Sequence, residues 1–344
     1  MFKNIQMLRA VAAAMVFLFH ASAHYQPLGG RFHFFSEFAG IGFSGVDIFF
    51  VISGFVVAHT TFDKERTLSN AWTFARQRLL RIYLGYWPFF GLALALAYIY
   101  APISLAEQDL LRSFLLTTMD ARGMVLYVSW SLTVELIFYA LATASFALPV
   151  ALAKSLVPAC GIGTFLILVW IDSLTHSDLL IFVSFFLEFV AGMTVCLYRE
   201  KLTSRWLIGP LVIAALVAFA AGANLHATSN PVRVFTFGVG ALALVMLALV
   251  LEQSQSLIAS RSWVALGDAS YTLYLLHPSL LTVFYFWGLR DFLAGQSVFM
   301  RETGFFLYLG LGFWVSRAIY VWMERPIYQW ASSSRRHAST VLRL

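Results

Sequence analysis

Long apolar stretches recur from one end of the chain to the other, and they limit what it can fold into. About ten of them approach the roughly 20 residues that a helix needs to cross a bilayer. They lie near residues 5–24, 41–60, 83–101, 127–149, 156–173, 178–199, 206–226, 233–253, 266–288 and 303–323. Backbone polar groups in lipid must find partners within their own segment, so each stretch is expected to be a helix. The sequence predicts an all-α integral membrane protein with about ten transmembrane helices.

The composition agrees with a chain that lies almost wholly in the membrane. Of its 344 residues, 60% are hydrophobic and only 12% are charged, which is more apolar than a soluble domain requires. We predict a single transmembrane domain over residues 1–331 and a short basic cytoplasmic tail, 332–344, near anionic lipid. A net charge of +6, scattered along the chain, argues for membrane lipids as partners and against nucleic acid.

The basic residues predict the orientation of the helices. With the N-terminus in the cytoplasm, fifteen Lys and Arg residues fall on the inner side, and six fall on the outer side: Arg31, Arg112, Arg122, Arg233, Arg290 and Arg301. Positive charge gathers on the cytoplasmic side of membrane proteins. Both termini are therefore predicted to be cytoplasmic.

Two further features are expected to be without consequence. Cys160 and Cys196 form neither a disulfide framework nor a metal-binding pattern, and no metal is predicted. Ala21-Ser22-Ala23 resembles a signal-peptide cleavage site, but Arg9 interrupts the apolar stretch before it. We expect the N-terminal segment to be retained.

Arg9 and His20 are the first candidates for function. Ionisable groups inside a membrane segment are rare and are functional candidates by default. The two residues are eleven positions apart, which on a helix returns to nearly the same face about 16 Å further along. A cation and a titratable imidazole are thus predicted to share one stripe at two depths of the membrane.

Two carboxylates are predicted to lie at the depth of His20. Asp47 lies near the outer start of the second apolar stretch, and Glu135 lies in the outer half of the fourth. A neutral histidine beside a carboxylate is a good general base, so we take His20, Asp47 and Glu135 as candidate catalytic residues. The alternative is a polar cluster that holds helices together.

Other polar side chains follow helical spacing around these three residues. One face of the fourth stretch carries Ser131, Glu135 and Tyr139, with Trp130 beside it, and the ninth stretch presents a stripe of three more. The stripe either lines a passage or bonds to neighbouring helices. The candidate substrate-binding residues are Trp130, Ser131, Tyr139, Ser270, Tyr274 and His277.

Arg78 and Arg81 lie just before the third stretch, on the predicted inner side. Their spacing makes them neighbours on a helix, and paired guanidinium groups suit phosphate. Ordinary positive-inside charge is the alternative explanation.

Several of these elements, in this order, resemble the acyltransferase 3 family of bacterial multi-spanning membrane O-acyltransferases. They comprise Asn4-Ile5-Gln6-Met7-Leu8-Arg9, the Arg9/His20 pair, Gly45-Val46-Asp47-Ile48-Phe49-Phe50-Val51-Ile52-Ser53-Gly54, Arg78-x-x-Arg81-Ile82-Tyr83, Ser129-Trp130-Ser131-Leu132-x-x-Glu135, Ser270-Tyr271-x-x-Tyr274-x-x-His277-Pro278 and Glu324-Arg325-Pro326. The opening looks most like the branch that decorates exopolysaccharides. One departure is Leu84, near a place where the family would have proline.

The resemblance implies transfer of an acyl group, commonly acetyl, from cytoplasmic acyl-CoA to a hydroxyl of a polysaccharide or lipid-linked glycan. It implies a multi-pass protein of the bacterial inner membrane with no permanently bound cofactor. The family's extra C-terminal extracytoplasmic esterase-like domain has no counterpart in this sequence, so we expect the stand-alone membrane form. It assigns catalysis to His20 and donor binding to Arg9, Arg78 and Arg81.

Two mechanisms and two rival functions stay open on the sequence. His20 either deprotonates the sugar hydroxyl or is itself acylated first in a two-step relay. The rival functions are a non-enzymatic glycan or lipid transporter and an acyltransferase for a small-molecule acceptor.

Overall fold

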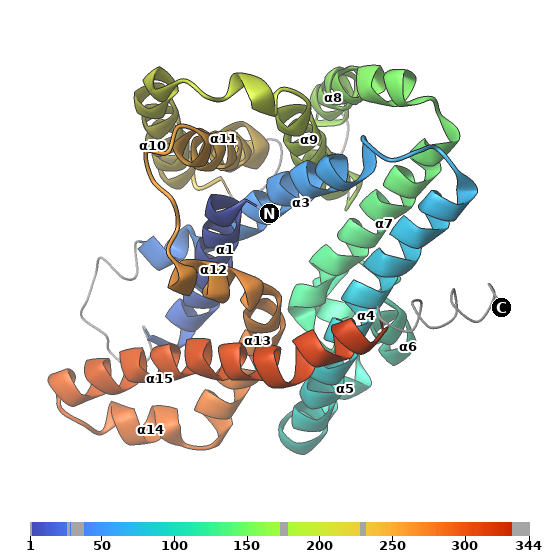
Figure 1. Ribbon diagram of the computed structural model, residues 1–344. Helices are drawn as coiled ribbons and strands as arrows, with labels where there is room; N and C mark the ends of the chain where they lie inside the picture. The colour runs from blue at the N-terminus through green and yellow to red at the C-terminus, as the bar shows by residue number, and fades with distance from the viewer. Residues whose placement is uncertain (1, 26–27, 29–37, 173–177, 228–231, 332–344) are drawn as a thin grey trace. The chain divides into compact units, whose positions relative to one another are not determined.

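The computed structural model describes residues 2–25, 28, 38–172, 178–227 and 232–331, and all of their regular structure is helical (Figure 1). The α-helices are α1 (Lys3–Tyr25), α3 (Gly45–Thr61), α4 (Leu68–Tyr100), α5 (Pro102–Ala106), α6 (Leu110–Leu115), α7 (Trp130–Ala144), α8 (Val150–Asp172), α9 (Asp178–Leu197), α10 (Ile208–Asn224), α11 (Val239–Gln253), α12 (Arg261–Asp268), α13 (Ser270–Phe286), α14 (Leu289–Ala294) and α15 (Val298–Ile319). Short 3-10 turns such as η3 (Tyr127–Ser129) and two π-helical segments, η7 (Val234–Gly238) and η8 (Tyr320–Glu324), join or extend them.

The predicted all-α membrane architecture is confirmed in its main feature. Within the described part of the chain, eight helical segments are long and apolar enough to cross a membrane by length and composition: 3–25, 42–61, 68–100, 127–147, 150–167, 205–224, 234–253 and 298–331. Helices α9 and α13 occupy the other two predicted places. The total of ten spans and the cytoplasmic termini stay predictions, and the predicted tail 332–344 lies outside the described residues.

Helix α4 differs from the sequence prediction at its start. The third span was expected to begin at residue 83 after a loop, whereas α4 already begins at Leu68 and continues unbroken to Tyr100. Residues 68–84 contain neither proline nor glycine, so nothing in them stops a helix, and long arginine side chains can extend from it toward water. Arg78 and Arg81 therefore stand on the transmembrane helix itself.

The described chain divides into two compact units. Unit 1 comprises residues 1–16, 41–72 and 134–267, and unit 2 comprises residues 17–40, 73–133 and 268–344. Of the predicted site residues, Arg9, Asp47, Glu135 and Tyr139 belong to unit 1. Unit 2 holds His20, Arg78, Arg81, Trp130, Ser131, Ser270, Tyr274 and His277.

Unit 1 is built around the tight packing of α3 against α9, which run side by side (Figure 1). A Cβ on Gly54 would lie 1.8 Å from the carbonyl oxygen of Phe189, and a Cβ on Gly192 would lie 1.9 Å from that of Val51. Apolar side chains of α3 and α9 continue the contact into a core shared with α11. Small residues allow such close backbone approach in membranes, where packing takes over from the hydrophobic effect.

Alanine at Gly54 or Gly192 is expected to destabilise the protein by about 1–3 kcal/mol, because the two backbones must separate. Gly163 in α8 has nothing within 4 Å of its Cβ position, so Gly163→Ala is the matched control and should be neutral or slightly stabilising. Thermal unfolding of the three variants in detergent measures the difference. Equal melting temperatures for all three would contradict this account of the α3–α9 contact.

Asn4 fixes the beginning of α1 within unit 1. Its side-chain amide donates to the carbonyls of Ala248 (3.1 Å) and Leu257 (2.8 Å), and its side-chain carbonyl accepts from the amide of Ala259 (2.7 Å). Its backbone amide donates to the Glu252 carboxylate at 2.8 Å. Asn4 is fully buried, and this satisfied network gives the asparagine of the opening motif a structural role.

Unit 2 is organised around α13, which packs against α15. The Tyr308 hydroxyl of α15 donates to the carbonyl of Leu280 at 2.6 Å, and Thr272 donates to the carboxylate of Glu324. On α4, the Ile82 carbonyl accepts a 2.9 Å hydrogen bond from the Tyr271 hydroxyl. Helix α13 is therefore held to both α15 and α4, which fixes the polar stripe that it carries.

Candidate active site

Two histidines from α1 and α13 meet in unit 2. Nδ1 of His20 lies 3.1 Å from Nε2 of His277, and Nδ1 of His277 lies 3.3 Å from the carbonyl oxygen of Leu273. His277 is fully buried and His20 is half-buried. The predicted catalytic histidine thus has a second imidazole as its hydrogen-bonding partner.

When both rings are neutral, this chain of contacts determines which nitrogen of each ring carries its hydrogen. A carbonyl oxygen only accepts, so Nδ1 of His277 carries the hydrogen that points at Leu273. Nε2 of His277 is then the acceptor, and Nδ1–H of His20 donates to it. With Nδ1 as the donor, Nε2 is the accepting nitrogen of a neutral His20 ring, as a general base requires.

Aromatic rings and hydroxyl groups surround the pair. The ring of Tyr127 lies 5.1 Å from that of His20, and the ring of Tyr274 lies 6.0 Å from that of His277, measured between centroids. The hydroxyls of Ser131 and Tyr274 are 2.8 Å apart, and Tyr274 also donates to the Val128 carbonyl at 2.9 Å. Three predicted substrate-binding residues, Ser131, Tyr274 and His277, are therefore linked to each other or to His20.

The other two predicted substrate-binding residues of unit 2 lie near the starts of their helices. Trp130 is half-buried at the beginning of α7. Ser270 is 1% exposed, and its hydroxyl has no hydrogen-bond partner among the described residues. A substrate role for these two side chains stays a prediction.

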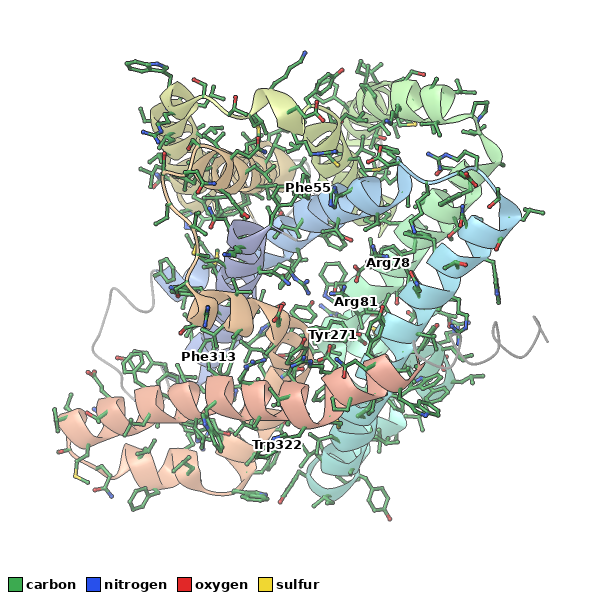
Figure 2. All side chains as sticks on the ribbon, in the orientation of Figure 1. Phe55, Arg78, Arg81, Tyr271, Phe313 and Trp322 are labelled. Carbon is green, nitrogen blue, oxygen red and sulfur yellow. The ribbon has the colours of Figure 1, made fainter. Side chains whose placement is uncertain are left out.

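Arg78 and Arg81 stand one turn apart on α4, and Figure 2 shows Tyr271 of α13 beside them. Both arginines are half-buried. Tyr271 bonds to the carbonyl of Ile82, next to Arg81, and it precedes His277 by six residues on α13. Six residues of helix span about 9 Å, so α13 places the arginines and the histidine pair at different depths of unit 2.

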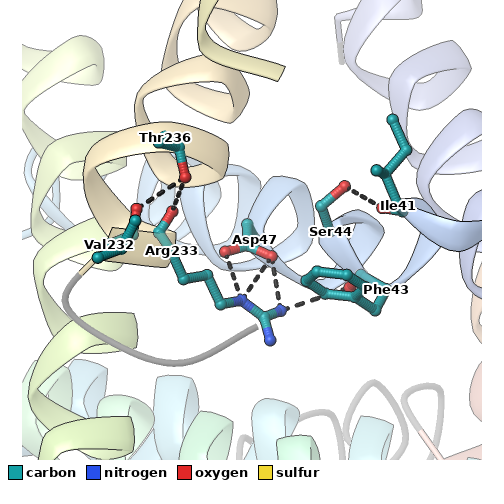
Figure 3. Close-up of polar contacts among 7 residues, drawn as sticks. All are labelled: Ile41, Phe43, Ser44, Asp47, Val232, Arg233 and Thr236. Carbon is teal, nitrogen blue, oxygen red and sulfur yellow. Dashed lines mark hydrogen bonds and ion pairs between the residues drawn. The ribbon is translucent and has the colours of Figure 1, made fainter. Parts of the chain in front are cut away.

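Asp47 of unit 1 is engaged by an arginine. Nε of Arg233 donates to Oδ1 of Asp47 at 3.0 Å and one terminal nitrogen donates to Oδ2 at 2.7 Å (Figure 3). Asp47 is fully buried, and the guanidinium lies between the rings of Phe43 (4.8 Å) and Phe185 (5.1 Å). Asp47 is also in the first turn of α3, where the helix dipole favours a negative charge.

Glu188 of α9 completes this charged group. It is 2% exposed, and Asp47 and Arg233 both interact with its carboxyl group. The Asp47–Arg233 ion pair is the arrangement expected of a buried structural contact. Support of His20 by Asp47 stays a prediction.

The remaining predicted residues of unit 1 also have local partners. Glu135 accepts hydrogen bonds from the hydroxyls of Ser53 (3.1 Å) and Tyr139, so the predicted shared face of Glu135 and Tyr139 is present. A terminal nitrogen of Arg9 donates to the side-chain oxygen of Gln6 at 3.3 Å, one turn earlier on α1. Catalytic support by Glu135, substrate binding by Tyr139 and donor binding by Arg9 stay predictions.

Sequence reasoning missed Tyr127 and Arg233. Tyr127 opens the predicted fourth span but belongs to none of the spaced polar sets. Arg233 was counted only as an outer charge. Its position at the outer start of the eighth span, the depth predicted for Asp47, was the signal that could have identified the ion pair.

Comparisons with known proteins identify the family of this chain. A family model described as an acyltransferase domain matches residues 2–324. The exopolysaccharide production protein ExoZ of Rhizobium meliloti (strain 1021) is 32% identical over 260 residues, which cover 71% of this chain and 78% of that protein. No solved structure matches the chain significantly. With a match over nearly its whole length, the chain belongs to the acyltransferase 3 family of membrane proteins, and this membership implies acyltransferase activity.

Proposed function

We propose that this protein is a membrane O-acyltransferase that moves an acyl group from cytoplasmic acyl-CoA to a hydroxyl of a surface or lipid-linked polysaccharide. The acyl group that we propose is acetyl. The observation that carries the proposal is the chain of contacts from Leu273 through His277 to Nδ1 of His20, which orients the His20 ring as a general base requires. The acceptor class is supported by the relative that is named for exopolysaccharide production.

In this proposal the donor binds through arginines. Arg78 and Arg81 hold the phosphates of acyl-CoA, since two guanidinium groups one turn apart can each form paired hydrogen bonds with phosphate oxygens. Arg9 contacts a donor phosphate or polarises the thioester carbonyl. The rise of α13 between Tyr271 and His277 requires the donor to extend at least about 9 Å from the level of the arginines toward His20.

The chemistry is a single displacement at the acyl carbon. Nε2 of His20 removes the proton of the acceptor hydroxyl as its oxygen attacks the thioester carbonyl. The carbon–sulfur bond breaks, the CoA thiolate leaves, and the proton on His20 passes to the thiolate. His277 orients the His20 ring and, as a neutral hydrogen-bond acceptor, stabilises the positive charge that develops on it, in the place that a carboxylate has in a catalytic triad.

Mass spectrometry of surface polysaccharide tests the proposal. Cells that lack the protein, cells restored with it and cells restored with His20→Ala are compared for O-acyl groups and for the amount of exported polysaccharide. We expect acyl groups only with the unaltered protein and equal export in all three. A His20→Ala strain that keeps every acyl group but exports less polysaccharide would instead identify a transporter.

Exchange of His277 tests the orienting role assigned to it. His277→Leu removes the acceptor for the Nδ1 hydrogen of His20 and is expected to lower kcat by about a hundredfold through misorientation, with KM for acetyl-CoA little changed. His277→Gln keeps an acceptor oxygen and should recover much of that loss. Steady-state kinetics of the purified variants, alongside their melting temperatures, measure both effects. If leucine and glutamine give the same kcat as histidine, His277 does not position the base.

A further inference from the structure

A small cavity lies beside the histidine pair in unit 2. It has a volume of about 150 Å³, is partly open, lies among α4, α5, the turn at η3 and α13, and is lined in part by Tyr100, Gln108, Tyr127, Pro278 and Ser279. Tyr127 contacts both the cavity and the proposed base, because it lines the cavity and its ring lies 5.1 Å from the ring of His20. Pro278 and Ser279 directly follow His277 on α13. A molecule in this cavity is therefore a neighbour of the reacting centre.

Two polar atoms of the lining have no partner among the described residues. They are the hydroxyl of Ser279, a residue only 3% exposed, and the side-chain carbonyl oxygen of Gln108. A buried polar group without a hydrogen bond costs about 1–3 kcal/mol. Thr282, one turn further along the same helix, avoids this cost because its hydroxyl donates to the Pro278 carbonyl at 3.0 Å. Ser279 and Gln108 are thus ready to bond to a ligand.

The chemistry of these two atoms selects the kind of ligand. A side-chain carbonyl oxygen such as that of Gln108 only accepts, so its partner must bring a hydrogen. The acyl group and thioester carbonyl at the reacting end of the donor have no such hydrogen, and within acyl-CoA only groups away from that end, such as the pantetheine amides, can donate. Each hydroxyl of a sugar ring donates as well as accepts. The aromatic rings of Tyr100 and Tyr127 supply apolar surface for the ring carbons of a sugar.

The size of the cavity limits how much of a glycan it can hold. Its volume is below the roughly 300–1,000 Å³ of pockets that enclose drug-sized ligands and corresponds to about five water molecules. One sugar ring, partly enclosed, is the largest fragment that suits it. The rest of a polysaccharide has to extend beyond the cavity.

We propose that this cavity is the subsite for one sugar residue of the acceptor, which Gln108 and Ser279 hold by hydrogen bonds and Tyr127 places beside His20. The inference rests on the proposed function and assigns to that site its glycan-binding residues. Gln108 and Ser279 are positioning residues, so they set which sugar, and which of its hydroxyls, faces the base.

Steady-state kinetics of the purified full-length protein separate acceptor from donor binding. The substrates are acetyl-CoA and polysaccharide isolated from cells that lack the protein. Gln108→Leu and Ser279→Ala are each expected to raise KM for polysaccharide about tenfold, the effect of one lost hydrogen bond, and to leave KM for acetyl-CoA unchanged. Gln296→Leu, whose side chain bonds to the Phe292 carbonyl outside the cavity, is the matched control. Unchanged KM for polysaccharide in both variants, or a raised KM for acetyl-CoA, overturns the inference.

A binding measurement makes the inference independent of turnover. The His20→Ala protein is titrated with the same polysaccharide, with and without Gln108→Leu. Weaker binding in the double variant supports the subsite even if the unaltered protein transfers no acyl group, in which case the proposed function alone fails. Equal binding in the two proteins overturns the subsite while leaving the proposed function intact.

Discussion

Replacement of His20 by alanine is expected to lower kcat for acyl transfer by about 10²–10⁴-fold, the usual contribution of a general base. The loss follows from the geometry of unit 2, where Nδ1 of His20 contacts His277 and Nε2 is the nitrogen to which we assign proton transfer. The measurement is transfer of labelled acetyl from acetyl-CoA to polysaccharide by the purified protein. Because His20 is half-buried rather than part of the dense core, the melting temperature should change little.

The same assay distinguishes direct transfer from the two-step relay. Incubation with labelled acetyl-CoA alone, followed by rapid denaturation, would trap an acetyl group on His20 if the imidazole is acylated first. Direct transfer predicts no label on the protein without acceptor. His20→Ala that retains full kcat would contradict both mechanisms and the assignment of the site.

Replacement of Asp47 by alanine is expected to destabilise the protein by about 3–5 kcal/mol, since it leaves the Arg233 guanidinium buried without its counter-charge. The pair is bidentate, Asp47 is fully buried, and Arg233 has only 12% of its side chain exposed. Arg233→Leu should cost a similar amount for the converse reason. Unfolding of the variants in detergent measures these losses.

The double variant Asp47→Leu/Arg233→Leu decides between structure and catalysis. Removal of both charges should restore most of the stability, because apolar residues can replace a buried ion pair at little cost. A stable and active double variant would establish a structural role for Asp47. A stable but inactive one would support the sequence prediction that Asp47 assists His20.

Much of the architecture could be read from the sequence because lipid leaves few choices. An apolar stretch of about 20 residues in a membrane has to be helical, and the helices lie where hydropathy placed them. The exception is α4, which begins at Leu68 instead of residue 83. Hydropathy marks the part of a helix that lies in hydrocarbon, and a helix with arginines can continue past that boundary.

The sequence by itself determined which residues to examine. Ionisable side chains within apolar stretches are costly to place there, and this cost singles out Arg9, His20, Asp47 and Glu135 without any coordinates. Regular spacing likewise grouped Ser270, Tyr274 and His277 on one face of α13.

Only the tertiary structure decided which of these residues meet. The sequence of one segment predicts how deep a residue lies in the membrane. The residue that faces it depends on how a second helix is rotated and packed, and close backbone contacts such as that at Gly54 determine this packing. In the structure, the partner of His20 is the imidazole of His277, whereas the sequence suggested a carboxylate. The Asp47 carboxylate instead forms an ion pair with Arg233. The base was visible in the sequence, whereas its orienting partner and the adjoining cavity appeared only in the fold.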